Sequence, residues 1–260
     1  MIVANLKGGL GNQMFQIAAG YALARRTNQQ FCINYKLQHN CIQGFAPSKY
    51  KDTLFSKIAS TEHVPTKFYS EPHFHYSKIP DYDDVVIDGY FQSIKYFEEY
   101  FEEIRNLFTF PKSCYDKHQV IKEATQGSIG MHIRRGDYLK YATTHTPQPI
   151  EYYIRAVEAL RPKCQPYSVL VASDDWKSVN EEKILDGFGG KVMCTMGCTE
   201  LEDLYLLSQC KQLIISNSTL AWWAAILGVH NKEVAAPAQW FGPDGPQDYQ
   251  DIYPEGWHKL

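Results

Sequence analysis

Residues 128–138 read Ser128-Ile129-Gly130-Met131-His132-Ile133-Arg134-Arg135-Gly136-Asp137-Tyr138 and join a short apolar run to a basic pair. The run from Ser128 to Met131 predicts a short strand, and the two arginines then follow its carboxyl end, where open α/β sheets bind ligands. The planar donor fork of arginine matches the paired oxygens of a phosphate. The alternative is a salt-bridged strand end, in which Arg135 pairs with Asp137 and binds nothing else.

The second half of the chain alternates strands with helices. Apolar periodicity predicts strands at 167–172, 191–194 and 212–215 and helices at 149–161, 200–210 and 220–227. Two of these strands run into polar clusters, Ser173-Asp174-Asp175-Trp176 and Ser216-Asn217-Ser218-Thr219. Each cluster alone is equally well explained as the cap of the following helix. Three clusters at three strand ends predict a parallel sheet with a nucleotide-sized site along one edge.

The first half opens with a strand, a glycine-rich turn and a helix. The predicted ranges are 2–6, 7–13 and 13–26, and further strands are expected at 31–35 and 85–91. Such a turn can bind an anion at the helix N-terminus, although it matches neither the P-loop nor the dinucleotide fingerprint, so a simple tight turn is the alternative. An irregular segment from Leu37 to Asp84, a helix at 96–108 and a polar helix at 115–125 complete this half. The domain boundary is expected between Pro111 and Gly127, which divides the chain into domains 1–115 and 116–260.

Two patterns in the irregular segment resemble metal sites. His73-Phe74-His75 places two imidazoles on one face of an extended chain, but no acidic or cysteine partner lies at ligand spacing, which favours surface histidines. Asp81-Tyr82-Asp83 has the Asp-x-Asp form that binds divalent metals, yet it follows Pro80, a residue typical of turns, which favours a solvated loop. No metal is therefore expected to take part in function.

Composition excludes several classes of protein. A net charge of −3 and a pI near 6.3 give no basic surface for a nucleic acid. The seven cysteines are scattered without CxxC spacing, which indicates reduced thiols in a cytoplasmic protein. The N-terminus does not resemble a signal peptide, and no apolar stretch is long enough to span a membrane. A peripheral association with a membrane is compatible with this composition.

Four motifs together resemble the α-1,2-fucosyltransferases of glycosyltransferase family 11. The resemblance extends from residue 2 to about residue 240, and the motifs stand in the family's order: Gly8-Gly9-Leu10-Gly11-Asn12-Gln13-Met14-Phe15-Gln16, His132-Ile133-Arg134-Arg135-Gly136-Asp137-Tyr138, Ser173-Asp174-Asp175-Trp176 and Ser216-Asn217-Ser218-Thr219-Leu220-Ala221-Trp222-Trp223. It implies a GT-B-type α/β fold of two Rossmann-like halves, with the donor GDP-fucose bound mainly by the C-terminal half. It also implies inverting, metal-independent transfer of fucose to the 2-hydroxyl of galactose on an oligosaccharide or polysaccharide.

The resemblance also implies roles for individual residues. Arg134 would hold the β-phosphate with help from Arg135, and Asn12 would face the same phosphate. Asp174 or Asp175 would recognise guanine, while Asp137 is a candidate base. The remaining expected donor-binding residues are Gly9, Gly11, His132, Ser173, Ser216, Asn217, Ser218 and Thr219.

Three alternatives remain open at this point. The first is a fucosyltransferase of another linkage, such as α-1,6, because its phosphate clamp would look the same. The second is a nucleotide- or glycan-binding protein without catalysis. The third is a metal-dependent GT-A transferase that uses Asp81 and Asp83.

Overall fold

A computed structural model describes residues 1–37, 44–126, 128–161, 167–228 and 232–260. Cys41, Gly127 and Cys164 therefore lie outside the described residues. The chain divides into two compact units, of which unit 1 comprises residues 1–110 and 248–254 and unit 2 comprises residues 111–247 and 255–260. The predicted boundary at residues 115 and 116 lies inside a helix of unit 2, α3 (Lys112–Gln126).

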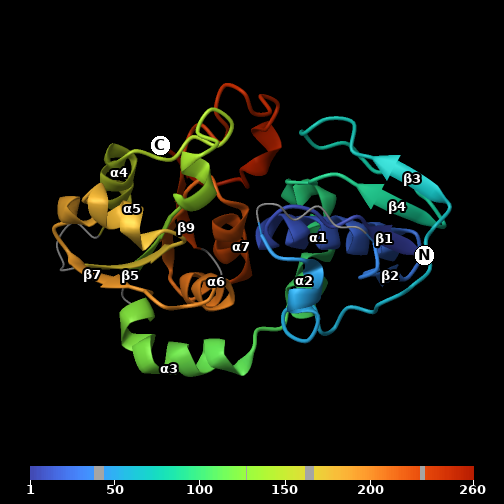
Figure 1. Ribbon diagram of the computed structural model, residues 1–260, viewed down its shortest axis with the longest axis horizontal. Coiled ribbons are helices and arrows are strands. Elements are labelled where there is room, and N and C mark those ends of the chain that lie inside the picture. Colours follow the sequence, from blue (N-terminus) through green and yellow to red (C-terminus); the bar gives the residue numbers. More distant parts are fainter. Residues whose placement is uncertain (38–43, 127, 162–166, 229–231) are drawn as a thin grey trace. The chain divides into compact units, whose positions relative to one another are not determined.

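Unit 1 is built on a four-stranded parallel sheet with the order β2-β1-β4-β3 (Figure 1). Its elements are β1 (Ile2–Ala4), α1 (Leu10–Arg26), β2 (Phe31–Cys32), β3 (Lys67–Ser70), β4 (Val85–Asp88) and α2 (Phe101–Leu107). The edge strand β3 lies in the segment predicted to be irregular, so that prediction was wrong there. Strand β3 could not be predicted from the sequence, because its residues are largely exposed and do not alternate between apolar and polar.

The glycine-rich turn of unit 1 is held together by α1. Helix α1 begins at Leu10, earlier than the predicted Gln13, with Gly9 at its N-cap. Two buried glutamines of α1 bind the turn: Gln13 Nε2 donates to the Gly8 carbonyl at 3.1 Å, and Gln16 Oε1 accepts from the Lys7 N–H at 2.8 Å. Gly8 has a φ of +73°, which favours glycine. The glutamines of this motif therefore fix the shape of the turn.

Unit 2 is built on a six-stranded parallel sheet with the order β10-β9-β8-β5-β6-β7. After α3 its elements are β5 (Ser128–Ile133), α4 (Ile150–Leu160), β6 (Ser168–Ser173), α5 (Trp176–Glu181), β7 (Lys191–Cys194), α6 (Glu200–Ser208), β8 (Gln212–Ile214), α7 (Thr219–Leu227), β9 (Glu233–Ala236) and β10 (His258–Lys259). Figure 1 shows α4 and α5 on one side of this sheet and α3 and α6 on the other. No helix among the described residues combines the length and apolarity needed to cross a bilayer.

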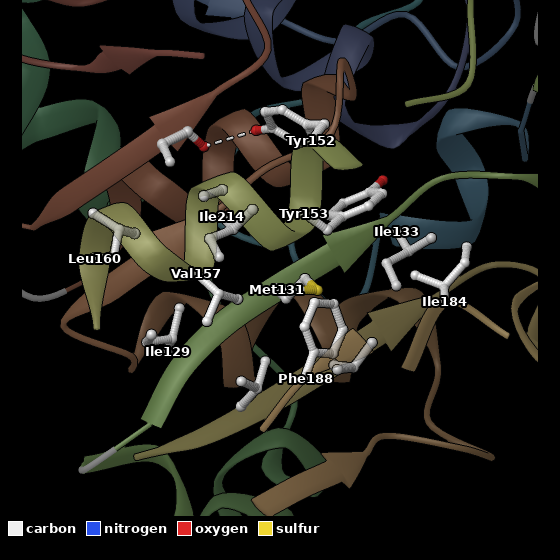
Figure 2. Close-up of a cluster of buried hydrophobic side chains, with 14 of the residues drawn as sticks. Ile129, Met131, Ile133, Tyr152, Tyr153, Val157, Leu160, Ile184, Phe188 and Ile214 are labelled. Carbon is white, nitrogen blue, oxygen red and sulfur yellow. Dashed lines mark hydrogen bonds between the residues drawn. The ribbon is translucent and has the colours of Figure 1, made fainter. Parts of the chain in front are cut away.

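The alternation of β5 builds both faces of the sheet. Ile129, Met131 and Ile133 point toward Tyr153 and Val157 of α4 (Figure 2). On the opposite face, a Cβ at Gly130 would lie 2.7 Å from Leu213 Cδ1 and 3.1 Å from Cys210, so glycine permits close packing there. His132 lies on this second face as well, because side chains alternate along a strand. The core thus holds β5 firmly on both sides up to its carboxyl end.

Candidate active site

The strand order of unit 2 creates a topological switch point beside β5. The chain runs from β5 outward through β6 to β7, and then returns to place β8 on the other side of β5. In open α/β sheets, the crevice beyond the carboxyl ends of strands at such a switch point is the usual ligand site. Arg134 follows β5, Asp174 follows β6 and Ser216 follows β8. The predicted clusters therefore meet at one sheet edge.

Arg134 lies between two carboxylates at this edge. Its Nη2 pairs with Asp137 Oδ1, and its Nη1 lies 3.3 Å from Asp174 Oδ2. The guanidinium also stacks over the Tyr138 ring, 5.1 Å from its centroid. Burial works against the charge, but the neighbouring Asp174 and Asp137 outweigh it and raise the pKa of Arg134. The Nε of Arg134 is buried and lacks a protein partner. Arg134 is thus a fixed cation with a free donor.

Arg135 is buried and serves the loops around the site. Its Nε and Nη2 donate to Glu182 Oε2 at 3.0 and 2.8 Å, and its Nη2 also donates to the Gln148 carbonyl at 2.9 Å. The Arg135 side chain is only 2% exposed. The alternative in which Arg135 pairs with Asp137 is not what the structure has, because Arg134 pairs with Asp137 and Glu182 at the end of α5 pairs with Arg135. Arg135 therefore joins three segments of the chain beneath the site.

The two acids after β6 have different partners. Asp174 Oδ1 accepts from the Arg135 backbone N–H at 2.9 Å, while its Oδ2 faces Arg134. Asp175 is the N-cap of α5: its Oδ1 accepts from the Ser178 N–H at 3.1 Å and its Oδ2 accepts from the Ser178 hydroxyl at 2.7 Å. The capping alternative is thus confirmed for Asp175. A guanine-binding role for either acid stays a prediction.

His132 and the end of β8 form a buried polar layer below Arg134. His132 Nδ1 lies 2.8 Å from the Ser216 hydroxyl. Burial, with a contribution from Arg134, lowers the pKa of His132 to about 3, so the imidazole is neutral at physiological pH. Asn217 Nδ2 donates to the Trp240 carbonyl at 2.9 Å, and the Tyr138 hydroxyl donates to the Asn217 carbonyl at 2.8 Å. This layer fixes the ends of β5 and β8 to each other.

The hydroxyls that begin α7 are placed where an anion would bind. Ser218 is the N-cap residue, but its side chain makes no capping hydrogen bond. Thr219 is the first residue of the helix. The amide dipoles of α7 give this end a positive potential. Because the Ser218 side chain does not cap the helix, the first N–H groups of α7 can donate to a ligand oxygen.

The sequence prediction missed Asp203. This residue lies in the first turn of α6, and its Oδ1 is buried without a protein partner. Thr195, just after β7, is buried, and its hydroxyl faces the Asp203 carboxylate. Burial raises the pKa of Asp203 to about 7 against the lowering effect of the Thr195 hydroxyl, and the charges of Glu202 and, less strongly, Asp174 add to the rise. The only sequence signal was a third acid in the helix start Thr199-Glu200-Leu201-Glu202-Asp203, where Thr199 and Glu202 already form the capping box.

The remaining predicted donor-binding residues are Ser173 in unit 2, whose hydroxyl accepts from the Asp175 N–H at 3.2 Å, and three residues of unit 1. Gly9 and Gly11 begin α1, and Asn12 in its first turn is buried. Gln92 Nε2 donates to Asn12 Oδ1 at 2.9 Å, which fixes the amide with its Nδ2 turned away from Gln92. Contact of these three residues with a phosphate stays a prediction.

The two metal-like patterns also lie in unit 1. Asp81 pairs with Arg26 at 2.8 Å and Asp83 pairs with Lys67, so both carboxylates are neutralised at the surface. His73 is exposed and His75 is partly exposed, in agreement with the prediction of surface histidines, but an acidic partner comes from a distant part of the sequence. His75 Nδ1 lies 3.1 Å from Asp248 Oδ2, a partner too distant in the sequence for any local pattern to reveal.

Comparison with known proteins relates this site to sugar transfer. The chain is 29% identical to the alpha-1,2-colitosyltransferase of Escherichia coli over 100% of its own length and 99% of that protein. It is 27% identical to the galactoside 2-alpha-L-fucosyltransferase of Caenorhabditis elegans, with 90% and 71% covered.

Solved structures show the fold. The fucosyltransferase NodZ from Bradyrhizobium matches with a TM-score of 0.55 at 13% identity, over 87% of this chain and 93% of that one. A structure of NodZ alpha-1,6-fucosyltransferase soaked with GDP-fucose matches with a TM-score of 0.53 at 14% identity, over 87% and 92%. The predicted GT-B-type α/β fold is thus confirmed. The family model for glycosyl transferase family 11 matches residues 1–260. This chain is therefore an enzyme of glycosyl transferase family 11.

Proposed function

We propose that the protein transfers L-fucose from GDP-fucose to the 2-hydroxyl of a galactose residue on a glycan, with inversion and without a metal in the chemical step. The observation that carries the proposal is Arg134, a fixed cation with a free Nε at the switch point of the sheet. The family and the names of the relatives support the sugar and the linkage. The NodZ structure soaked with GDP-fucose supports the donor.

The reaction needs charge stabilisation more than proton transfer. The acceptor oxygen attacks C1 of fucose as the bond from C1 to the GDP oxygen breaks, so negative charge develops on the β-phosphate while C1 becomes oxocarbenium-like. In the proposal Arg134 Nε donates to a β-phosphate oxygen, and the Ser218 hydroxyl and the amides that begin α7 meet the same diphosphate. Asp137 and Asp174 keep the guanidinium in place, which spares it reorganisation during the reaction.

The acceptor proton has one candidate base in unit 2. Asp137 Oδ2 is buried and has no protein partner, while its Oδ1 holds Arg134. The galactose hydroxyl would pass its proton to this oxygen as the new bond forms. Because cleavage of the donor bond runs ahead of attack in a loose transition state, a weak base suffices.

Guanine would be recognised by Asp203. The N1–H and 2-amino groups of guanine are two adjacent donors, and a carboxylate offers two adjacent acceptors. Asp174 and Asp175 already accept hydrogen bonds from the protein, whereas Asp203 Oδ1 accepts none. A base that supplied these donors would favour the ionised form of Asp203 and lower its pKa from the raised value.

The decisive test is GDP release from GDP-fucose with lactose present and EDTA in the buffer. Release that requires lactose is expected, and Arg134→Ala should lower kcat by about 10²- to 10³-fold because one preorganised donor is lost. Arg134→Lys should recover only part of the rate, since an ammonium keeps the charge but not the fork. The matched control is Arg155→Ala, which removes an exposed arginine of α4 and should change nothing. Full turnover in a folded Arg134→Ala protein would contradict the clamp.

A second donor sugar has specific support. The relative at 29% identity over the whole chain is named a colitosyltransferase. Colitose is fucose without its 3-hydroxyl, so the same diphosphate site would serve both donors. Comparing kcat/KM for GDP-fucose and GDP-colitose decides between them, and digestion of the product with a glycosidase specific for α-1,2 linkages tests the bond formed.

A further inference from the structure

Unit 1 contains a second cluster of chemically competent side chains, formed by His73, His75 and Asp248. One ligand atom from each lies within 4.8 Å of the other two. The two imidazole rings stack with centroids 3.4 Å apart and an interplanar angle of 14°. None of these residues enters the proposed transfer reaction. We propose that they bind one divalent transition-metal ion of the zinc class, with solvent completing the shell.

The donor set and its spacing suit such an ion. Zinc binds imidazole nitrogens and carboxylate oxygens at about 2.0–2.2 Å, so donors in a tetrahedral shell lie about 3.4 Å apart. His75 Nδ1 and Asp248 Oδ2 are already separated by 3.1 Å. A metal ion would replace the proton between these two atoms. His73 is exposed, and one of its ring nitrogens already lies within 4.8 Å of the other two donor atoms.

The surrounding hydrogen bonds orient the ligands beforehand. His73 Nδ1 lies 3.1 Å from the His75 carbonyl, which can only accept, so the neutral ring carries its proton on Nδ1. Its Nε2 lies 3.0 Å from the Ser77 hydroxyl and would exchange that hydrogen bond for the metal ion. Asp248 Oδ2 accepts from the Phe74 N–H at 2.9 Å. A histidine that donates its other N–H to a carbonyl and a carboxylate held by an amide are the outer contacts typical of protein metal sites.

The site would join two distant parts of the sequence within unit 1. Asp248 begins the segment 248–254, the part of unit 1 that follows most of unit 2 in the chain. Asp251 anchors the same segment by accepting from the Tyr76 N–H at 2.9 Å and pairing with Lys95 at 2.5 Å. A metal at His73, His75 and Asp248 would add a third attachment. Its role is therefore structural, separate from the diphosphate site of unit 2.

The test uses the full chain, stripped with EDTA and freed of any histidine tag. Titration with ZnCl2 by calorimetry should show that this cluster binds one equivalent of zinc. In His75→Gln and in His73→Gln the affinity for this equivalent should be at least about tenfold weaker. Titration with CoCl2 should give the visible absorption of a tetrahedral site. Thiols elsewhere also bind zinc, but they remain in every variant, so the difference from wild type isolates this cluster.

The matched control is His63→Gln. His63 is also a histidine beside a carboxylate, 3.1 Å from Asp84, and both residues lie outside the cluster. This variant should bind zinc with the affinity of the wild type. Zinc should also raise the melting temperature of the wild type and of this variant by the same amount. Because His73 is exposed, His73→Gln should fold even if His75→Gln does not. Unchanged binding in His73→Gln, or a loss in His63→Gln of the same size, would overturn the proposal.

Discussion

At the scale of single residues, the buried carboxyl of Asp203 lowers the stability of the protein at neutral pH, and we propose that it does so because it binds guanine. Its pKa of about 7 stands above the ordinary value of 3.8. Between these pH values the native state therefore binds more protons than the unfolded state, and the free energy of unfolding falls as pH rises toward 7. Asp203→Asn removes the buried charge, so we expect it to stabilise the protein at pH 8 by about 1 to 3 kcal/mol and to do little at pH 4. Urea unfolding at the two pH values measures this difference.

The same substitution should weaken donor binding. An amide offers guanine only one acceptor, so affinity for GDP should fall by about 10- to 100-fold by calorimetry. Asp186→Asn is the control, because Asp186 is an exposed acid of unit 2. If Asp203→Asn bound GDP like the wild type, guanine recognition would have to be assigned elsewhere.

The site residues found from the sequence share one property. Arg134, Asp174 and Ser216 lie shortly after the ends of predicted strands, and a parallel sheet brings strand ends together whatever the details of packing. Asp203 sits at a helix start, where acids are common, and only its burial marks it as unusual. The ion-pair partner of Arg135 could not be predicted from the sequence either, since Glu182 lies 47 residues away in the chain.

At the scale of elements, the loop after β5 packs directly against the loop after β6. A Cβ on Gly136 would lie 2.1 Å from Asp174 Oδ2, the oxygen that faces Arg134. Gly136→Ala should therefore push Asp174 away from the guanidinium. We expect kcat to fall by about 10²-fold, because a displacement near 1 Å of a catalytic group has effects of that size. Steady-state GDP release measures the loss.

Gly189→Ala is the control for this change. The Cβ it adds has as its nearest neighbour the Tyr167 hydroxyl at 3.8 Å, an ordinary contact. Both variants should keep a native melting temperature within a few degrees. Wild-type turnover in Gly136→Ala would mean that Asp174 does not need its present position.

The sequence predicted long elements better than short ones. Helix α1 and the buried strands β5 and β6 have clear periodicity and were found, apart from their end residues. The strands β3 and β10 are short and largely exposed, so hydrogen bonding to a neighbouring strand defines them and their composition does not. The predicted helix at 96–108 is replaced by two short 3-10 turns followed by α2.

At the scale of the whole molecule, two carboxylates hold the segment 248–254 within unit 1. Burial alone would raise the pKa of both carboxyls. The Phe74 amide and other partners instead lower the pKa of Asp248 below its ordinary value, and the Lys95 ammonium and other partners do the same for Asp251. Their stabilisation is present above pH 4 and is lost as pH falls through the lowered values. We expect hydrogen exchange at 248–254, corrected for intrinsic rates, to accelerate below pH 4 ahead of global unfolding.

Asp251→Asn tests this acid step. The amide retains an acceptor for the Tyr76 N–H but loses the pair with Lys95. Exchange at 248–254 should then be faster already at pH 6, with a smaller further change in acid. Equal exchange in variant and wild type at both pH values would contradict the anchoring role of Asp251.

The return of residues 248–254 to unit 1 also sets a rule for exchanging parts between related enzymes. A chimera that replaces only residues 1–110 would pair a foreign first unit with the native segment 248–254. Asp248 and Asp251 would then meet neighbours that were not selected for them, in place of His75, Tyr76 and Lys95. Transplanting the first unit of this enzyme therefore requires three crossover points, after residues 110, 247 and 254, so that residues 248–254 are exchanged together with residues 1–110.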